Sequence, residues 1–371
     1  MNDRVECAPG DIGGEIFPHI RTFTLPPHPF NPCKASEREL LAYGLPRRPN
    51  PETHPVLARR WDRIAGRRHE FITPELKPLP MRRHIDHDLI ERRALLDSEL
   101  KRYVEKQSEG GRSDLILDLV QIRKIILSDR ISLVDLRSHI KDILALLPET
   151  SSNWSGAYVK RPADEPVMTV AGEWTIPGVN PPTDINGRYT DGTYLCGAWI
   201  GIDGTSGSGD VLQAGTGSQC VVAGGKFVST QFFAWIEWFG LPSVAVANFP
   251  VSVGDHIALT VCAPFTTTHG VALFNNLTTG QTTTIGIAPP AGTSLVGNVA
   301  EWIIEDPTQS SGAQYPFPVY SGTTFTGCTA GTKTHELYAW DGTEIDMVVG
   351  GTTLSTGVIQ GKQTVFCHYG A

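Results

Sequence analysis

The feature that most limits how this chain can fold is an abrupt change in composition near residue 150. Residues 1–150 contain 25 of the 31 Lys and Arg and 23 of the 39 Asp and Glu, whereas residues 151–371 contain 6 and 16. The later region also contains 31 of the 38 Gly and seven of the eight Trp. Since 371 residues exceed what one compact core usually holds, the sequence predicts two regions with different structures.

The later region has the texture of a β protein. Short apolar runs such as FFAWIEWF, HIALTVCA and AEWIIE alternate with turn residues, chiefly Gly, Pro, Asn and Thr. β-Branched and aromatic residues suit a pleated, half-buried surface, and closely spaced turn signals are typical of all-β domains. This pattern predicts an antiparallel sandwich or barrel over residues 151–371.

The earlier region divides in two. Residues 1–83 contain 13 of the 27 Pro, which favours extended or irregular chain, with one short helix at 35–43 that Ser36 would cap. Within residues 84–150, apolar residues recur at spacings of three and four until Pro148 ends the pattern. We therefore expect a Pro-rich extended region followed by a helical segment.

Composition argues against several partners. A β region with six basic and 16 acidic residues would repel phosphate, so we expect no nucleic-acid partner. No run of about 18 apolar residues could span a membrane, and the N-terminus lacks the apolar core of a conventional secretion signal. The seven Cys are odd in number and show no CxxC spacing, which leaves the redox compartment undecided.

Residues that could bind a metal or a phosphate are sparse. His84 and His87 have the separation of a ligand pair, but no third ligand is near and the HExxH pattern is absent. The Gly-rich run GIDGTSGSGD lacks the GK[ST] of a P-loop and leads into no predicted helix. We predict neither a metal nor a cofactor, and we interpret the two His as solvent-facing.

One carboxylate lies inside a run that otherwise predicts a buried strand, NVAEWIIEDP. Side chains alternate along a strand, so Glu301 and Glu305 share a face at a separation of about 13 Å. Glycosidase carboxylates stand about 5 to 9.5 Å apart, so these two do not form such a pair. The run TEIDMVV alternates Glu344 with Asp346 but has Val348 where a third acid would be needed, which also disfavours a glycosidase.

A partner for Glu301 emerges from a set of motifs that occur in a fixed order. They are SSNWSGAYV (151–159), CGAWIGIDG (196–204), DVLQAG (210–215), AWIEWF (234–239) and NVAEWIIEDP (298–307). Together they resemble the glutamic peptidases, the eqolisin family. The resemblance extends over about residues 151–371, and the WIGIDG, LQAG and AEWIIE blocks are its most diagnostic parts.

This resemblance implies a two-sheet antiparallel β-sandwich of the concanavalin-like type, with a catalytic pair of one Gln and one Glu. The Gln of the LQ-x-G motif corresponds to Gln213, and the Glu of the AE-[WF]-I motif corresponds to Glu301. A carboxylate with a pKa near roughly 4.3 can activate water in mild acid, while an amide stabilises the oxyanion. The implied enzyme is an acid-acting glutamic endopeptidase with polypeptide substrates.

The resemblance also implies roles around this pair. Trp199, Asp203 and Glu237 match family positions near the cleft, where they would contact substrate or hydrogen-bond the Gln loop. Taken alone, the tryptophan could equally be core and the aspartate a turn residue. FTGC and VFCHYG resemble the Cys-bearing end of the family domain, which implies a disulfide between Cys328 and Cys367. A reduced, buried pair is the alternative.

In the family, a basic propeptide masks an acidic catalytic domain. Residues 1–150 are richer in base and contain seven of the 11 His, which would gain charge in acid and weaken an electrostatic contact. We therefore hypothesise intramolecular inhibition by residues 1–150, relieved by cleavage near 148–153. A permanent helical accessory domain is the alternative. The family implies secretion, but no signal is visible, so localisation stays uncertain.

A non-catalytic β-sandwich module that binds carbohydrate or protein is the competing interpretation of the later region. It predicts aromatic platforms and needs no pairing of Gln213 with Glu301. The two interpretations differ in one observable: a peptidase requires these side chains to converge on one face of a sheet.

Overall fold

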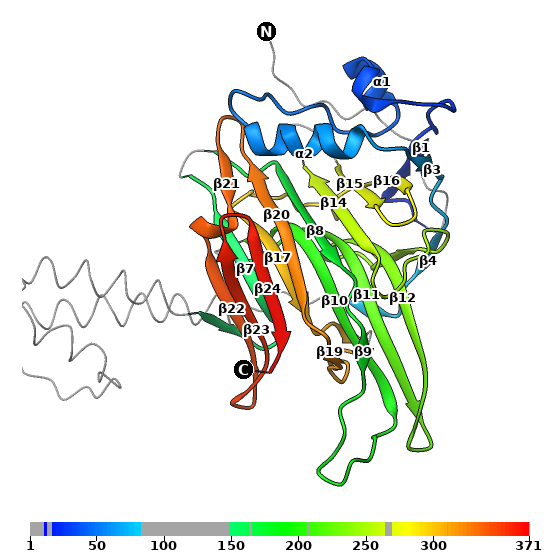
Figure 1. Cartoon of the computed structure of the whole chain (residues 1–371), viewed down its shortest axis with the longest axis vertical. Coiled ribbons are helices and arrows are strands. Elements are labelled where there is room, and N and C mark those ends of the chain that lie inside the picture. Colours follow the sequence, from blue (N-terminus) through cyan, green and yellow to red (C-terminus); the bar gives the residue numbers. More distant parts are fainter. Residues whose placement is uncertain are drawn as a thin grey trace, which may run out of the picture.

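The computed structural model describes residues 11–12, 17–82, 148–162, 165–205, 208–263, 269–309 and 311–370 (Figure 1). The helices predicted within residues 84–147 lie outside these ranges, as do His84 and His87. In the described part of the chain strands predominate, and nearly all of them pair antiparallel. The all-β antiparallel architecture predicted for the later region is confirmed.

Most of the strands pair in one continuous order. The order is β1 (Asp11–Ile12), β2 (Ile20–Thr22), β16 (Gln281–Ile287), β15 (Gly270–Asn276), β14 (His256–Cys262), β8 (Thr169–Thr175), β20 (Thr323–Gly331), β24 (Thr364–Tyr369), β23 (Thr352–Gly361), β22 (Thr343–Val349), β7 (Trp154–Lys160), β17 (Val299–Glu305), β10 (Gly192–Asp203), β11 (Val211–Ala223), β12 (Lys226–Trp238), β13 (Val244–Val246) and β4 (Leu76–Pro78).

This ribbon of strands folds back on itself as two layers. Strands β8, β14 and β20 pack face to face against β10, β11 and β17, which are not their hydrogen-bonded neighbours. We call the layer that contains β15, β14, β8 and β20 the back layer, and the layer that contains β7, β17, β10, β11 and β12 the front layer.

Short elements complete the fold. They are η1 (Pro32–Lys34), α1 (Glu37–Ala42), α2 (Pro55–Ala65), β3 (Glu70–Phe71), β5 (Met81–Arg82), β6 (Glu149–Ser151), β9 (Val179–Asn180), β18 (Thr308–Gln309), β19 (Val319–Tyr320), β21 (Glu336–Tyr338) and η2 (Ala339–Asp341). Strands β3, β6 and β21 pair with β16, β22 and β20, while β5 pairs with β18 and β9 with β19. No helix among the described residues is long and apolar enough to span a membrane.

The main core lies between the two layers. Two tryptophans bridge them with indole hydrogen bonds. Trp302 of β17 donates to the carbonyl oxygen of Ala171 in β8 at 2.9 Å, and Trp174 of β8 donates to Thr216 Oγ1 of β11 at 3.0 Å. Most buried indole N–H groups have an acceptor, and these two bonds help to fix how the layers are stacked.

The front layer also buries its outer face. A second apolar cluster covers that face, and we call it the outer cluster. Its buried members are Trp154, Tyr158, Leu195, Trp199, Trp235, Val299, Ile303 and Ile345. Because side chains alternate along β17, the residues on this face include Glu301 as well as its apolar neighbours. The carboxylate noticed in the sequence therefore points into the outer cluster rather than into the main core.

The Pro-rich region is more ordered than predicted. The short helix at 35–43 is confirmed as α1, and Ser36 forms a capping box with Glu39. The sequence interpretation missed α2, whose first residue is Pro55, a position where a missing N–H costs nothing. Helix α2 lies across the back layer and packs on β20 and β21 (Figure 1). Its stability comes from this packing, which a Pro count does not reveal.

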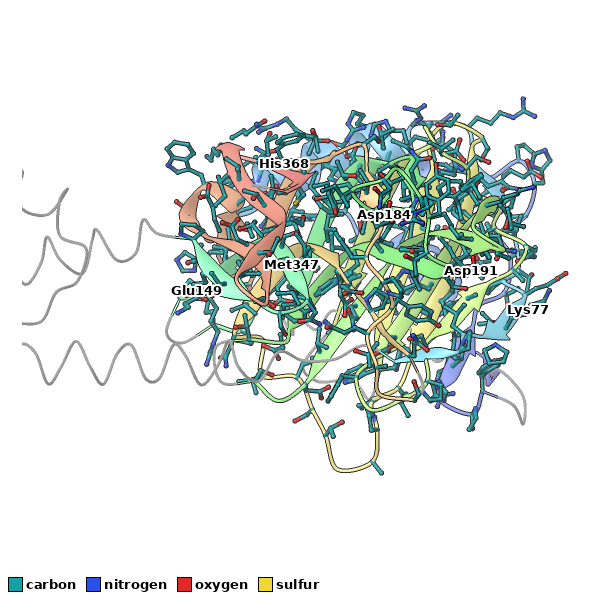
Figure 2. All side chains as sticks on the ribbon, turned by 90° about the horizontal axis from the view of Figure 1, so that it is seen from below. Lys77, Glu149, Asp184, Asp191, Met347 and His368 are labelled. Carbon is teal, nitrogen blue, oxygen red and sulfur yellow. The ribbon has the colours of Figure 1, made fainter. Side chains whose placement is uncertain are left out.

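After α2 the chain crosses to the other side of the molecule. Strand β4 extends the front layer at the β13 edge, and β5 pairs with Thr308–Gln309. We call residues 76–82 the strap. In the view from below, Lys77 of β4 lies at one side and Glu149 of β6 at the opposite side (Figure 2). The N-terminal region therefore touches both the back layer and the front layer.

Candidate active site

The register of the front layer places the two predicted catalytic residues in one row. Glu301 of β17 pairs with Gly201 of β10, Gly201 pairs with Gln213 of β11, and Gln213 pairs with Glu237 of β12. Residues directly opposite one another in antiparallel strands point to the same face. Gln213, Glu237 and Glu301 therefore share the outer face of the front layer, as the peptidase interpretation requires.

Gly201 keeps open the space between the two polar side chains. Two strand spacings separate the Gln213 and Glu301 backbones, which corresponds to about 10 Å. A Cβ atom at Gly201 would stand 2.9 Å from the Trp199 ring and 3.3 Å from the Gln213 Cβ. A side chain at this position would therefore fill the gap across which Gln213 and Glu301 face each other.

Gln213 and Glu301 are both fully buried, with no exposed surface. The amide nitrogen and oxygen of Gln213 and both carboxylate oxygens of Glu301 have no hydrogen-bond partner among the described residues. Buried polar groups in folded proteins are almost always paired, and an unpaired one costs about 1–3 kcal/mol. Four such atoms on two side chains of one sheet face are a feature that stability of the fold does not explain.

The surroundings of Glu301 favour its neutral form. Burial raises its pKa well above the ordinary value, and the carboxylates of Asp203 and Glu305 raise it further. A Cβ atom at Gly204 would stand 3.2 Å from Glu301 Oε2, so the carboxylate lies close against the backbone there. Glu301 is thus a carboxyl group whose proton affinity is increased, which is typical of general acid–base residues.

Asp203 fixes the loop that leads into β17. Its carboxylate accepts backbone N–H bonds from Val296 and Gly297 at 2.6 and 2.8 Å, and from Asn298 at 2.6 Å. Burial raises the pKa of Asp203, although these three hydrogen bonds act in the opposite direction. The residue has a φ of 67°, in the left-handed region that Asp adopts more readily than most other residues. Asp203 therefore positions the start of the Glu301 strand.

Trp199 is buried within the outer cluster, where it forms the floor of the candidate site, and it presents no exposed surface. Its side chain is fully buried, its indole N–H donates to Glu305 Oε2 at 2.8 Å, and its ring meets Trp154 edge-on at 5.2 Å. It lies two residues from Gly201 on the same strand face. A contact between Trp199 and substrate stays a prediction, while its packing and its bond to Glu305 are direct observations.

We call the register partners Glu301, Gly201, Gln213 and Glu237 the catalytic row, after the role predicted for two of them. Glu237 connects this row to the strap. Ser243 donates its hydroxyl to Glu237 Oε2, and the Ser243 carbonyl accepts the backbone N–H of Leu79 at 3.0 Å. Glu237 is buried and stands opposite Gln213 in the register. Glu237 therefore lies beside Gln213 in the sheet, and its role near the cleft and in supporting that residue stays a prediction.

The strap and one loop cover this face. Leu79 and Tyr315 both pack against the outer cluster, and the Tyr315 hydroxyl donates to the Pro80 carbonyl at 3.2 Å. Strand β4 holds the strap at one edge through β13, and β5 holds it at the loop after β17. This cover accounts for part of the burial of a row that would otherwise face outward.

Sequence reasoning missed two residues beside the catalytic row. Tyr158 of β7 pairs with Glu301 on the side away from Gly201. It lies in the SSNWSGAYV motif, so strand alternation could have assigned it to this face. Ser243 lies in a short connection after β12, and no pattern in the sequence indicates it.

The predicted disulfide is absent from the structure. Cys328 and Cys367 are both buried and free, as in the alternative of a reduced pair. Cys367 pairs with Thr323, five residues before Cys328 on β20. The backbone N–H of Cys328 instead donates to the carbonyl oxygen of Gln363, four residues before Cys367. At about 3.3 Å per residue this offset exceeds the roughly 7 Å between Cα atoms that a disulfide can bridge.

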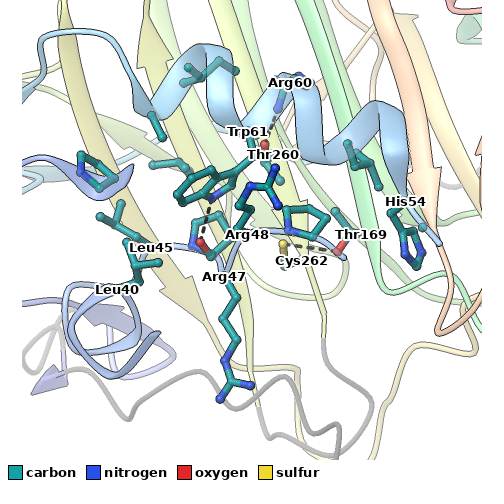
Figure 3. Close-up of a pocket in the computed structure, with 18 of the residues that line it drawn as sticks. Leu40, Leu45, Arg47, Arg48, His54, Arg60, Trp61, Thr169, Thr260 and Cys262 are labelled. Atoms are coloured by element: carbon teal, nitrogen blue, oxygen red, sulfur yellow. Dashed lines mark hydrogen bonds between the residues drawn. The ribbon is translucent and has the colours of Figure 1, made fainter. Parts of the chain in front are cut away.

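A separate cavity lies on the far side of the molecule. It has a volume of about 440 Å³ and lies between α2 and the back layer, with Leu57, Trp61 and Cys262 in its lining (Figure 3). None of the residues in the catalytic row lines it. In the described ranges, no group of three or more His, Cys, Asp and Glu is arranged to hold a metal ion.

Sequence comparisons place this chain within a known family. Residues 152–369, more than half of the chain, match the Peptidase A4 family. Aspergillopepsin-2 of Aspergillus niger is 30% identical over 231 residues, which are 59% of this chain and 78% of that protein. Scytalidopepsin B of Scytalidium lignicola is 29% identical over 238 residues, which are 62% of this chain and 83% of that protein.

Solved structures of similar proteins include a scytalido-glutamic peptidase with a transition-state analog inhibitor. It is 26% identical, covers 59% of this chain and 98% of its own, and gives a TM-score of 0.49. The aspergilloglutamic peptidase of Aspergillus niger is 30% identical, covers 47% of this chain and 99% of its own, and gives a TM-score of 0.42. Because this family match covers more than half of the chain, from β7 to β24, the chain belongs to the Peptidase A4 (eqolisin) family of glutamic peptidases.

Proposed function

We propose that this protein is an acid-acting endopeptidase in which Glu301 activates a water molecule and Gln213 stabilises the oxyanion. One observation carries the proposal: both side chains are fully buried on one face, and their four polar atoms have no hydrogen-bond partner among the described residues. A non-catalytic module would gain nothing from two such groups, because their burial costs stability. Membership of the Peptidase A4 family supports the same assignment.

The proposed reaction uses these groups in two steps. Burial keeps the pKa of Glu301 high while the front face is covered, and contact with water once that face is uncovered would lower it, so that the ionised form is populated in mild acid. Ionised Glu301 then takes a proton from water as the water oxygen bonds to the carbonyl carbon of the peptide. The Gln213 amide donates a hydrogen bond to the carbonyl oxygen as it becomes negative, and its own oxygen orients the water. Glu301 then gives the proton to the departing nitrogen as the carbon–nitrogen bond breaks. Neither a covalent intermediate with the protein nor a further reactant is needed.

The three residues around this pair have supporting roles in the proposal. Asp203 holds the entry of the Glu301 strand through three backbone hydrogen bonds, and Glu237 stands beside Gln213 with a hydrogen bond from Ser243. Trp199 forms the floor between them. These contacts would hold the two reactive side chains in place while substrate exchanges.

We also propose that the full chain is a latent form, with the strap as the inhibitory element. Leu79 packs on the outer cluster and bonds to Ser243, the partner of Glu237. The strap thus lies where a substrate chain would have to enter. Among the described residues of the N-terminal region, β2, α2 and β3 contact the back layer or its neighbour β16, whereas the strap contacts the front layer.

The hypothesised cleavage site near residues 148–153 lies in chain that is paired and partly buried. Residues near 148–153 are paired through β6 with β22, and Ser151 and Asn153 are buried. A cut there would require local unpairing, and it would leave the strap attached to α2. Activity would then appear only once the strap leaves the front face, by movement or by a second cut before residue 76.

Hydrolysis of a denatured protein by the full chain, after incubation at each pH from 2 to 7, tests the proposal. Wild type is compared with Glu301→Gln and with Glu165→Gln, a matched change on a carboxylate bound to Thr334 and His335. We expect acid-optimal cleavage in wild type and Glu165→Gln, and a loss of about 100- to 10,000-fold in Glu301→Gln. Equal cleavage in all three would exclude Glu301 from the reaction. No cleavage in any, with residues 1–82 also removed by limited digestion, would favour the binding module.

A further inference from the structure

Beyond the catalytic row, the outer face of the front layer carries Phe233. Phe233 of β12 pairs with Gly217 of β11, whereas Glu237 pairs with Gln213 four residues away on each strand. Alternate residues share a face, so Phe233 and Gly217 lie on the same face as the catalytic pair. Their distance from Gln213 along the strand is about 13 Å, the length of four residues in an extended peptide.

The phenyl ring of Phe233 lies directly over Gly217. A Cβ atom at Gly217 would stand 2.3 Å from Cζ and 2.5 Å from Cε2 of that ring. No side chain fits there unless the ring moves. The glycine is therefore what allows the ring to lie across β11, toward the line of the catalytic pair.

The ring continues the apolar floor of the site. Phe233 is half-buried and packs against the outer cluster, in which Trp199 and Trp235 are its aromatic members nearest along the strands. The strap presents an apolar side chain, Leu79, to this same cluster. Strand β4 of the strap runs alongside β13, so an extended chain on this side of the molecule follows the strand direction.

We propose that Phe233, seated on Gly217, forms an apolar subsite that selects an apolar side chain three or four residues from the scissile bond. The inference rests on the proposed peptidase function and deepens it by naming a specificity residue. Binding there removes apolar surface from water on both partners, whereas a charged side chain would lose hydration without gaining a partner. From the scissile bond, the subsite lies in the direction of the turn that joins β11 to β12.

The test measures a ratio within each enzyme. Full chain, incubated in acid until it cleaves a denatured protein, is given peptides that differ only in Leu or Lys at the third and fourth positions on each side of the cleaved bond. The ratio of kcat/KM for Leu over Lys does not depend on how much protein is folded. Phe232→Asp is the matched control, because Phe232 is also half-buried but packs on the main core.

We expect wild type to prefer Leu by at least tenfold at one of these positions. Phe233→Asp should abolish that preference or reverse it toward Lys, and Gly217→Ala should weaken it by displacing the ring. The Phe232→Asp control, and Phe232→Leu if the control does not fold, should keep the wild-type ratio. An unchanged ratio in both Phe233→Asp and Gly217→Ala would overturn the subsite alone. Absence of cleavage by wild type, also after residues 1–82 are removed by limited digestion, would instead overturn the peptidase proposal on which it rests.

Discussion

Replacing Arg60 with Met should destabilise the whole protein, because this residue joins the N-terminal region to the back layer. The guanidinium is buried, and it donates to Glu173 Oε1 at 3.1 Å and to Thr260 Oγ1 at 2.8 Å. Its remaining N–H groups donate to the carbonyl oxygens of Gly172 at 3.2 Å and Leu259 at 3.0 Å. One side chain of α2 therefore satisfies polar groups on both β8 and β14.

The expected magnitude follows from what the substitution leaves behind. Removing one partner of a buried ion pair costs about 3–5 kcal/mol. Glu173 retains contacts with Arg63 and His256, which places the cost at the lower end of that range. The two carbonyl groups and the hydroxyl would lose a partner as well, and Met would restore only the packing of the aliphatic stem. We therefore expect a loss of about 3 kcal/mol in the free energy of unfolding.

Urea unfolding at pH 7, followed by tryptophan fluorescence, measures this loss. The matched control is Arg48→Met, since Arg48 binds Asp62 through two hydrogen bonds of 2.6 and 2.7 Å. Those two side chains are 43% and 44% exposed, so the control should cost much less than Arg60→Met. If Arg60→Met and Arg48→Met unfold at the same urea concentration, α2 does not stabilise the sandwich and the reasoning fails.

Three further predictions test other parts of the structure. Burial acts to raise the pKa of Glu173, but the His256 hydrogen bond and the two Arg charges hold it at about 2. The stability that this group contributes is therefore present above pH 4.5 and lost as the pH falls toward 2, and Glu173→Gln should remove that part of the pH dependence of the urea midpoint. Gly156→Ala would place a Cβ atom 2.1 Å from the Trp302 carbonyl oxygen and should cost more than about 4 kcal/mol. Gly187→Ala, which also has a positive φ but no atom within 4 Å, should cost about 1 kcal/mol in the same unfolding measurement. Leu79→Asp should loosen the strap and shorten the lag before acid proteolysis about tenfold; an unchanged lag would contradict strap inhibition.

Much of the architecture could be predicted from local sequence. Apolar runs bounded by turn residues correspond to β12, β14 and β17, and Ser36 with Glu39 gives the capping box of α1. Local patterns failed where tertiary contacts decide. Helix α2 follows a Pro-rich stretch, and its first turn is held by Glu336 of β21, which accepts the N–H groups of Val56 and Leu57. No pattern near residue 55 indicates a partner 280 positions away.

The candidate site was predictable only as a pair of motifs. Alternation along the strand assigns Glu301 a face, but it does not say which strands flank it. The catalytic row draws Gln213 and Glu237 from consecutive strands, while Glu301 and Tyr158 come from strands far apart in the chain. Long-range pairing of this kind depends on the packing of the whole sheet, so the alignment across Gly201 could not be read from spacing.

The contacts of the N-terminal region differ in how they respond to acid. Along the chain, His69 comes after α2 and before the strap. Its ring nitrogens form hydrogen bonds with Thr282 Oγ1 at 2.8 Å and with the Ile64 carbonyl oxygen at 2.9 Å. Burial lowers the pKa of His69, so its contribution to docking is present above about pH 6.5 and is lost as the pH falls through the lowered value. Glu173, with its pKa near 2, keeps its charge across that interval. Mild acid should thus weaken the link that leads to the strap while Arg60 still holds α2. On the proposed latent form, the strap can leave the front face without loss of the helix from the back layer.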